Sequence, residues 1–332
     1  MLTPGPGLRG ARLADLARRE AGDGAAWAVA TEANGFAGPV TIGTGSIDGE
    51  ARRTLRIDGR PARGQAALAE VVAALWLTPA MDRMFIDGAS SRRRFFDRLV
   101  FGFDVSHASR LSAYERAMRE RSRLLRDGGA AGGDPAWLAA LEARMAENGI
   151  ALAAARCTTM RRLALVLGKG AGPFPGAETA FDGGVEGLLD HMPAVDAEAH
   201  LAAALADSRR YDAQVGGASH GPHRSDLIVR HKKSGAPAAQ CSTGEQKALL
   251  IAMVLATARL QAEVRGAAPL LLLDEVVAHL DGDHRAALFD EIHHVGAQAW
   301  LTGTDYAVFA PFGGRVQYLT VASGTIAASA VT

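Results

Sequence analysis

Short β-prone runs separated by glycine-rich turns make up the first part of the chain. Three such runs lie at residues 26–31, 40–42 and 53–57. Runs of this length joined by tight turns predict an antiparallel meander. Helical periodicity follows at 65–77, and a second helix is predicted through 91–98, where arginines and phenylalanines interleave.

A long stretch rich in alanine, leucine and arginine occupies residues 105–206, with one glycine-rich interruption at 128–133. This pattern predicts a helical hairpin lobe inserted into an α/β body. Arms of about twenty to thirty residues suit a small lid and are too short for an extended coiled coil.

The last third of the chain alternates predicted strands and helices. A strand at 226–231 precedes a long apolar helix, and a four-leucine strand then precedes another helix. A strand at 298–302 and a hairpin at 316–327 complete the pattern. Such alternation predicts a parallel sheet covered on both faces.

Composition limits the partners that this chain can have. Its 332 residues can form about two domains, or one large domain with an inserted lobe. Because 36 basic residues balance 36 acidic ones and 48% of residues are hydrophobic, any contact with DNA must come from local patches.

The cysteines, the histidines and the start of the chain suggest no metal, disulfide or membrane chemistry. Cys157 and Cys241 lie far apart in no metal-type spacing, which fits a reducing cytoplasm. The ten histidines have no carboxylate or cysteine at ligand spacing, and we expect structural or surface roles for them. We expect neither an export signal nor a membrane span.

A serine and a glycine stand at the start of the long apolar helix. Ser242 with Glu245 fits a capping box, in which side chains satisfy the free amides of an ordinary helix start. Alternatively, a hydroxyl, Gly244 and exposed N–H groups at a positive helix end form an anion site suited to a terminal phosphate. The motif by itself leaves both interpretations open.

Two adjacent carboxylates follow the four-leucine strand. Asp274 and Glu275 come directly after a run too apolar to be exposed, at the strand end where parallel sheets bind ligands. The first acid is suited to holding Mg²⁺ through its water shell, and the second to orienting or deprotonating an attacking water. The alternative is that both acids cap the next helix.

Further polar groups follow in a fixed order. Asp281 leads into the next helix, and residues 302–305 end the next strand with polar side chains. A serine-glycine helix start, paired acids, a Leu-Asp pair and a polar strand end in this order predict an ABC-type ATPase.

The motifs indicate a narrower family within the ABC class. The chain resembles the RecF family of bacterial DNA replication and repair proteins, which are ABC/SMC-type ATPases, over essentially its whole length. The motifs that carry the resemblance are CSTGEQKALL at 241–250, LDEVVAHLD at 273–281, LTGTD at 301–305, GPHRSDL at 221–227, and the block from WLTP at 76–79 to RFFD at 94–97.

The resemblance implies an ATP- and Mg²⁺-dependent homodimer of the cytoplasm that binds DNA at single-strand gaps or double-strand/single-strand junctions. It also implies action with RecO and RecR to help load RecA in recombination, DNA damage repair and the SOS response. The residues that would bind ATP across the dimer are Ser242, Thr243, Gly244, Glu245 and Gln246.

Other residues receive roles from the same resemblance. Asp274 would serve Mg²⁺, Glu275 would act on the catalytic water, and Asp281 would contact the other subunit as the D-loop. The switch position would fall near Thr304 and Asp305.

The family's phosphate-binding loop is the one motif that the chain does not contain. No Gly-x-x-x-x-Gly-Lys-Ser/Thr string occurs, and GKG at 168–170 is the nearest match. Residues 2–9 resemble the stretch just after the P-loop helix, so we expect that Met1 is a misassigned or truncated start. ATPase activity of this chain is therefore left undecided.

The expected fold is the α/β head of an ABC-type P-loop NTPase of the RecF/SMC kind, with an inserted helical lid lobe and with its first strands and P-loop missing. Residues 1–104 would form the N-terminal part of the ATPase lobe and 105–206 the lid. Residues 207–332 would carry the signature motif, the Walker B acids and the D-loop.

Basic residues could contact DNA. Arg92, Arg93 and Arg94 could neutralise phosphates, or they could form an ordinary solvated helix face. Six further arginines lie on the predicted lobe, at 110, 116, 119, 121, 123 and 126, with the same two interpretations.

Two other classes of function remain open beside the repair ATPase. A motor subunit of a membrane transporter is disfavoured, because its usual signature differs from Ser-Thr-Gly-Glu-Gln and it has no evident use for the helical lobe. A nucleotide-free DNA- or protein-binding remnant is what a chain without a P-loop would be.

Overall fold

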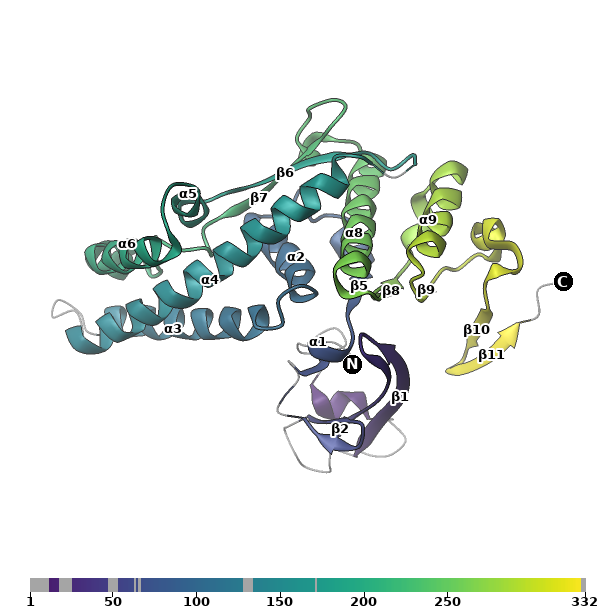
Figure 1. Ribbon diagram of the computed structural model, residues 1–332, viewed down its shortest axis with the longest axis horizontal. Helices are drawn as coiled ribbons and strands as arrows, with labels where there is room; N and C mark the ends of the chain where they lie inside the picture. Colours follow the sequence, from purple (N-terminus) through teal and green to yellow (C-terminus); the bar gives the residue numbers. More distant parts are fainter. Residues whose placement is uncertain are drawn as a thin grey trace.

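The computed structural model describes residues 12–17, 26–46, 53–62, 64, 67–127, 134–170 and 172–329. Figure 1 shows two long helices projecting from a body of helices and strands, with a small β unit beside that body. Two predicted segments fall outside the described residues, namely 2–9 and the glycine-rich 128–133.

The predicted meander is confirmed. Strands β1 (Trp27–Gly35), β2 (Gly38–Ser46), β3 (Thr54–Ile57) and β4 (Arg60–Pro61) form one antiparallel sheet in sequence order. Its core is small and consists of Val40, Ile42, Leu55 and Leu68, the last from the short helix α1 (Leu68–Val71).

The helix predicted at 65–77 is wrong beyond α1. Residues Ala74–Leu77 form strand β5, in which Leu75 and Leu77 are buried. A four-residue apolar run has no periodicity that separates a helix from a strand. Parallel pairing with the four-leucine strand, almost two hundred residues away, decides the conformation.

A three-stranded parallel sheet lies at the centre of the body, in the order β5-β8-β9. Strands β8 (Leu270–Leu273) and β9 (Ala299–Leu301) confirm the predicted strands. Helix α8 (Thr243–Arg265), which is buried on nearly every face as its sequence predicted, packs against the sheet, and α9 (Gly282–Val295) packs against α8.

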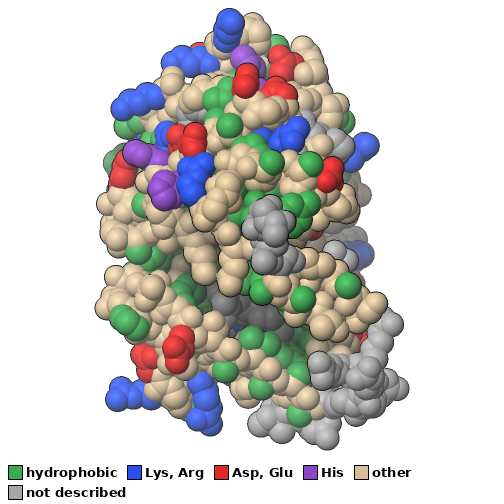
Figure 2. Space-filling view, turned by 90° about the vertical axis from the view of Figure 1, so that its right-hand side faces the viewer, with side chains coloured by type: hydrophobic (Ala, Val, Ile, Leu, Met, Phe, Trp, Pro, Cys, Tyr) green, Lys and Arg blue, Asp and Glu red, His purple; other side chains and the backbone are tan. Residues whose placement is uncertain are grey.

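The prediction that this sheet is covered on both faces is wrong. Trp76, Leu272 and Trp300 stand opposite one another in the register, on the face away from the buried leucines. Leu272 is 38% exposed and Trp300 is 52% exposed. Figure 2 shows hydrophobic side chains gathered around a hollow between two parts of the molecule. The described residues therefore leave this face open at Leu272 and Trp300, whereas Trp76 on the same face is partly buried beneath Arg98.

The predicted helical hairpin is confirmed. Helices α3 (His107–Asp127) and α4 (Pro135–Leu167) run side by side away from the body (Figure 1). The first half of α4 packs in the lobe with α3, α5 (Gly184–His191), α6 (Ala194–Asp207) and α7 (Arg209–Val215). Its last turns join the core of the body through Met160, Leu163 and Leu167.

The prediction that the 105–206 segment is helical throughout is wrong in one place. Strand β6 (Ala177–Asp182) lies within it and pairs antiparallel with β7 (Asp226–His231). The predicted strand at 226–231 is thus confirmed, but it belongs to a separate two-stranded sheet. The strand β6 was missed because its residues alternate between exposed and covered positions in the structure, but so short a sequence with two alanines does not show that alternation clearly.

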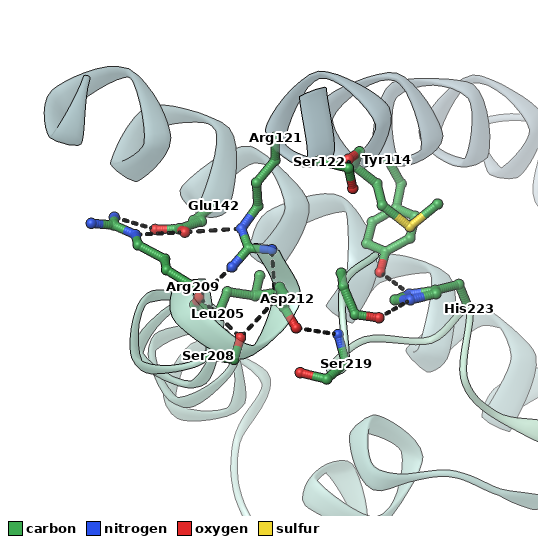
Figure 3. Close-up of polar contacts among 12 residues, drawn as sticks. Tyr114, Arg121, Ser122, Glu142, Leu205, Ser208, Arg209, Asp212, Ser219 and His223 are labelled. Atoms are coloured by element: carbon green, nitrogen blue, oxygen red, sulfur yellow. Dashed lines mark hydrogen bonds and ion pairs between the residues drawn. The ribbon is translucent and has the colours of Figure 1, made fainter. Parts of the chain in front are cut away.

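Buried ion pairs hold the helices of the lobe together (Figure 3). Arg121 is fully buried and donates to Glu142, Asp212 and the carbonyl of Leu205. Arg209 forms a second, two-pronged contact with Glu142. One of the six arginines noted in the lobe is therefore structural, because it joins α3 to α4 and α7.

The remaining elements are short. Helix α2 (Ala89–Phe101) confirms the helix predicted through 91–98, and Phe95 and Phe96 in it are buried. Strands β10 (Tyr318–Ala322) and β11 (Thr325–Ser329) form the predicted last hairpin. Five 3-10 helices complete the described parts, at Leu13–Leu16, Pro79–Met81, Ala238–Gln240, Val276–His279 and Tyr306–Arg315.

Candidate functional site

The start of α8 is an open, capped helix tip. The Ser242 hydroxyl accepts from the amide of Glu245 at 3.3 Å, and the Glu245 carboxylate accepts from the amide of Ser242 at 2.8 Å. The capping box is thus present. Hydrogen bonds from the side chain and the backbone of Ser242 lower the pKa of Glu245. Residues 242–245 are all exposed, so this tip is accessible to another molecule.

Packing within the described residues does not require glycine at position 244. A Cβ added there would meet no atom within 4 Å. Gln246, two residues further on, is buried and donates to the carbonyl of Cys241 at 2.8 Å. Space above Gly244 is therefore open for close approach from outside.

The paired acids lie at the carboxyl end of the parallel sheet. The Asp274 amide donates to Leu77 at 2.9 Å, which continues the pairing of β8 with β5. The Asp274 side chain is half-buried, whereas Glu275 is exposed. This is the edge at which open parallel sheets bind ligands.

Thr302, which follows β9, joins the two acids. Its hydroxyl donates to the Asp274 carboxylate at 2.6 Å and accepts from the Glu275 amide at 3.0 Å. The sequence motif included Thr302, but its role was missed because the pairing of β8 with β9 brings it to the acids. The signal was its position as the first polar residue after the neighbouring strand.

Glu275 adopts an unusual backbone conformation. Its φ of 51° and ψ of 25° lie in the left-handed region, which costs a residue with a Cβ about 1–2 kcal/mol. Strain of this kind persists where the surroundings enforce it, and it clusters at functional sites. The Thr302 hydrogen bond to the Glu275 amide is one such enforcing contact.

Lys247 connects the helix tip to the acid loop. Its ammonium group lies 3.4 Å from the carbonyl of Glu275 and 3.5 Å from the Asp82 carboxylate. Its side chain is only 7% exposed. Lys247 therefore links α8 to the loop that carries Glu275.

The remaining predicted residues lie close by in sequence but make other contacts. Asp281 caps α9, and hydrogen bonds from the backbone and the ring of His284 lower its pKa. Asp305 caps the following 3-10 helix, and Thr304 is exposed. Within the described residues, neither Thr304 nor Asp305 has a hydrogen bond to the paired acids.

The three arginines of α2 are not equivalent. Arg92 binds both oxygens of Asp226, at 2.7 and 2.8 Å. Arg93 is half-buried and donates to the carbonyl of Ser225 at 2.5 Å. Arg94 is exposed, and among the described residues it donates only to Ser91. Of these three arginines, Arg93 and Arg94 are therefore the two whose guanidinium groups contact no carboxylate among the described residues.

The described residues fit a metal only in part. They contain no cluster of three or more histidine, cysteine or carboxylate groups. One oxygen of Asp274 accepts from Thr302, which leaves the other for a metal-bound water. A cavity of about 20 Å³ beside Trp76 and Arg98 does not include the acids. No described helix has the length and apolar character that a membrane crossing requires.

A parallel sheet with two acids at its carboxyl edge, an exposed serine-glycine helix tip and an inserted helical lobe define an α/β ABC-type ATPase head. No model of a protein family matches the chain. Curated relatives are nevertheless close. The chain is 48% identical over 330 residues to the DNA replication and repair protein RecF of Mesorhizobium japonicum, with 98% of this chain and 86% of the relative covered.

The RecF proteins of Rhizobium rhizogenes and Brucella suis are 46% and 45% identical, with 99% and 98% of this chain and 87% and 84% of the relatives covered. The chain therefore belongs to the RecF family of DNA replication and repair proteins.

Solved structures agree on the fold. A structure described as the recombination mediator protein RecF-ATPrS in the RecFOR pathway superimposes with a TM-score of 0.84 at 19% identity, covering 99% of this chain and 86% of that one. The corresponding RecF-ATP structure gives 0.79 at 18% identity, with 97% and 84% covered.

Proposed function

We propose that two copies of this protein bind ATP between them and thereby control binding to DNA at single-strand gaps and double-strand/single-strand junctions. The observation that carries this proposal is the pairing of an exposed helix tip, open above Gly244, with strand-end acids held by Thr302. Each copy carries both features. In the proposed dimer, the helix tip of one copy would lie beside the strand-end acids of the other copy.

Each residue then has a separate task. The amides and hydroxyls of residues 242–246 would contact the γ-phosphate held by the other copy. Asp274 would hold Mg²⁺ through water, and Glu275 would orient or deprotonate the attacking water. When bound, the metal neutralises charge on the phosphate oxygens. Asp281 would contact the second copy, and Thr304 and Asp305 would sense the nucleotide.

The phosphate-binding loop would come from residues upstream of Met1. The exposed Leu272 and Trp300 support this, because parallel sheets of α/β proteins normally have both faces covered, whereas this chain leaves these two side chains open. A further strand and helix would bury this apolar surface. In-frame upstream codons that encode no such loop would refute this part of the proposal.

In the cell, the protein would act in the cytoplasm with RecO and RecR to help load RecA during recombinational repair and the SOS response. The relatives named RecF, and the solved RecF structures described in the RecFOR pathway, support this assignment. The body formed by residues 1–104 and 207–332 would hold ATP, and residues 105–206 would form the lid.

Binding measurements separate this proposal from its main alternative. The chain as it stands, and the same chain with its upstream residues restored, are titrated with ATP and with gapped duplex DNA. Tight ATP binding only by the restored protein is expected. If neither form binds ATP while both bind DNA, the protein is a nucleotide-free DNA-binding remnant, which the lack of a P-loop string in these 332 residues favours.

A Glu275→Gln change tests the shared site. In the restored protein it should trap an ATP-bound dimer, because the water is no longer activated while the phosphate contacts remain. Asp283→Asn, an exposed acid on α9, is the matched control and should not accumulate dimer. If E275Q stays monomeric with saturating ATP, the idea that the site is shared between two copies is wrong.

A further inference from the structure

The turn at 221–226, which the nucleotide site leaves without a role, is rigid. Gly221 has a φ of +133°, and a Cβ there would lie 2.1 Å from the Tyr114 hydroxyl. The Tyr114 hydroxyl bonds Nδ1 of His223 at 2.6 Å, and His223 Nε2 lies 2.9 Å from the carbonyl of Ala218 (Figure 3). Because a carbonyl only accepts, Nε2 carries the proton and Nδ1 accepts from tyrosine.

The end of the same turn is fastened to the body. Buried Arg156 donates to the carbonyl of Pro222 at 2.8 Å. The Ser225 carbonyl accepts from Arg93, and Asp226 is held by Arg92. The turn therefore has little freedom to move relative to α2.

Arg224 is the exception within this turn. Its backbone amide closes the turn by donating to Gly221 at 3.0 Å, but its side chain is exposed. Among the described residues, no hydrogen bond or ion pair engages its guanidinium group. A rigid turn thus presents one cation to solvent next to the residues that bind α2.

Positive charge is concentrated around this turn, and the acids near it offset that charge only in part. Burial, followed by the charges of Arg156 and, more weakly, Arg94, lowers the pKa of Arg93, although Asp226 and Asp97 act in the opposite sense. Burial also lowers the pKa of His223, and both Arg224 and Arg93 add to that effect. Asp226 binds Arg92 through both of its oxygens, so its charge is already paired with that arginine.

We propose that Arg224, Arg93 and Arg94 form one phosphate-binding surface for the backbone of DNA, with the 221–226 turn as its rigid platform. Guanidinium groups match phosphate oxygens in geometry, and a fixed turn loses little freedom on binding. The chain carries no net charge, so a local surface of this kind is what DNA binding requires. The inference rests on the proposed DNA-binding function and adds to it the surface responsible.

Salt-dependent binding, with ATP present, tests the surface in the protein with its upstream residues restored. Affinity for a labelled gapped duplex is measured between about 50 and 200 mM salt for the wild type and for Arg224→Gln. The variant should bind more weakly to every sequence, with a slope against salt reduced by about 1. Arg230→Gln is the matched control, because Arg230 is likewise exposed but lies on β7, six residues further along the chain.

The outcomes are distinguishable. An Arg224→Gln variant with the wild-type slope and affinity overturns the inference while leaving DNA binding intact. A wild type that binds no gapped duplex overturns both. If the variant loses affinity for polyglutamate but not for DNA, the surface serves an acidic protein, and the inference is equally wrong. An equal loss of affinity in Arg230→Gln would show that overall positive charge, and not this surface, drives DNA binding.

Discussion

Replacing Arg121 by methionine should destabilise the lid lobe strongly. Arg121 has no exposed side-chain surface and makes three polar contacts, to Glu142, Asp212 and the carbonyl of Leu205. Burial raises the pKa of Asp212, but hydrogen bonds from Ser219, Ser208 and Arg121 together hold it below its usual value. Removing the cation takes one partner away from each of two buried carboxylates.

The expected loss follows from which contacts survive. Breaking a buried ion pair by removing one partner costs about 3–5 kcal/mol. Glu142 keeps both contacts to Arg209, and Asp212 keeps the Ser208 hydroxyl and the Ser219 amide. We therefore expect the lower end, about 3 kcal/mol, out of a total free energy of unfolding of about 5–15 kcal/mol.

Urea denaturation, followed by circular dichroism, measures this difference. Arg123→Met is the control, because Arg123 is exposed two residues further along the same helix and should change stability by less than about 0.5 kcal/mol. Adding Asp212→Asn to Arg121→Met should restore part of the loss, since it removes the unpaired charge. Equal stability of the two methionine variants would refute the reasoning.

Three further changes test other features. Thr302→Val should cost about 1–2 kcal/mol in urea because it removes two hydrogen bonds at the acid loop, whereas Thr302→Ser should match the wild type. Glu275→Gly should raise the free energy of unfolding by about 1 kcal/mol, since glycine tolerates φ of 51°, and an unchanged midpoint would argue against strain. The lowered pKa of His223 keeps it neutral in the folded protein, so stability should fall as pH drops below about 6.5, and His223→Asn should reduce this slope in urea titrations at several pH values. If the slope is the same in both proteins, His223 does not carry the effect.

Sequence alone determined the features that depend on neighbours along the chain. The capping box at Ser242 and Glu245, the all-round apolar helix behind it and the leucine strand before Asp274 are local patterns, and each lies where it was predicted. The motifs in their order also indicated the family. These features follow from spacing within a few residues, which is what helix and strand periodicity record.

Tertiary structure decided what depends on residues distant in sequence. Residues Ala74–Leu77 became a strand because Leu270–Leu273 pairs with them, and Thr302 reached Asp274 only through β9. Of the arginines with the same sequence-level interpretation, Arg121 is buried in ion pairs while Arg94 stays exposed. Charge pattern cannot separate them, because the partner that buries one arginine lies about ninety residues away and is brought close only by folding.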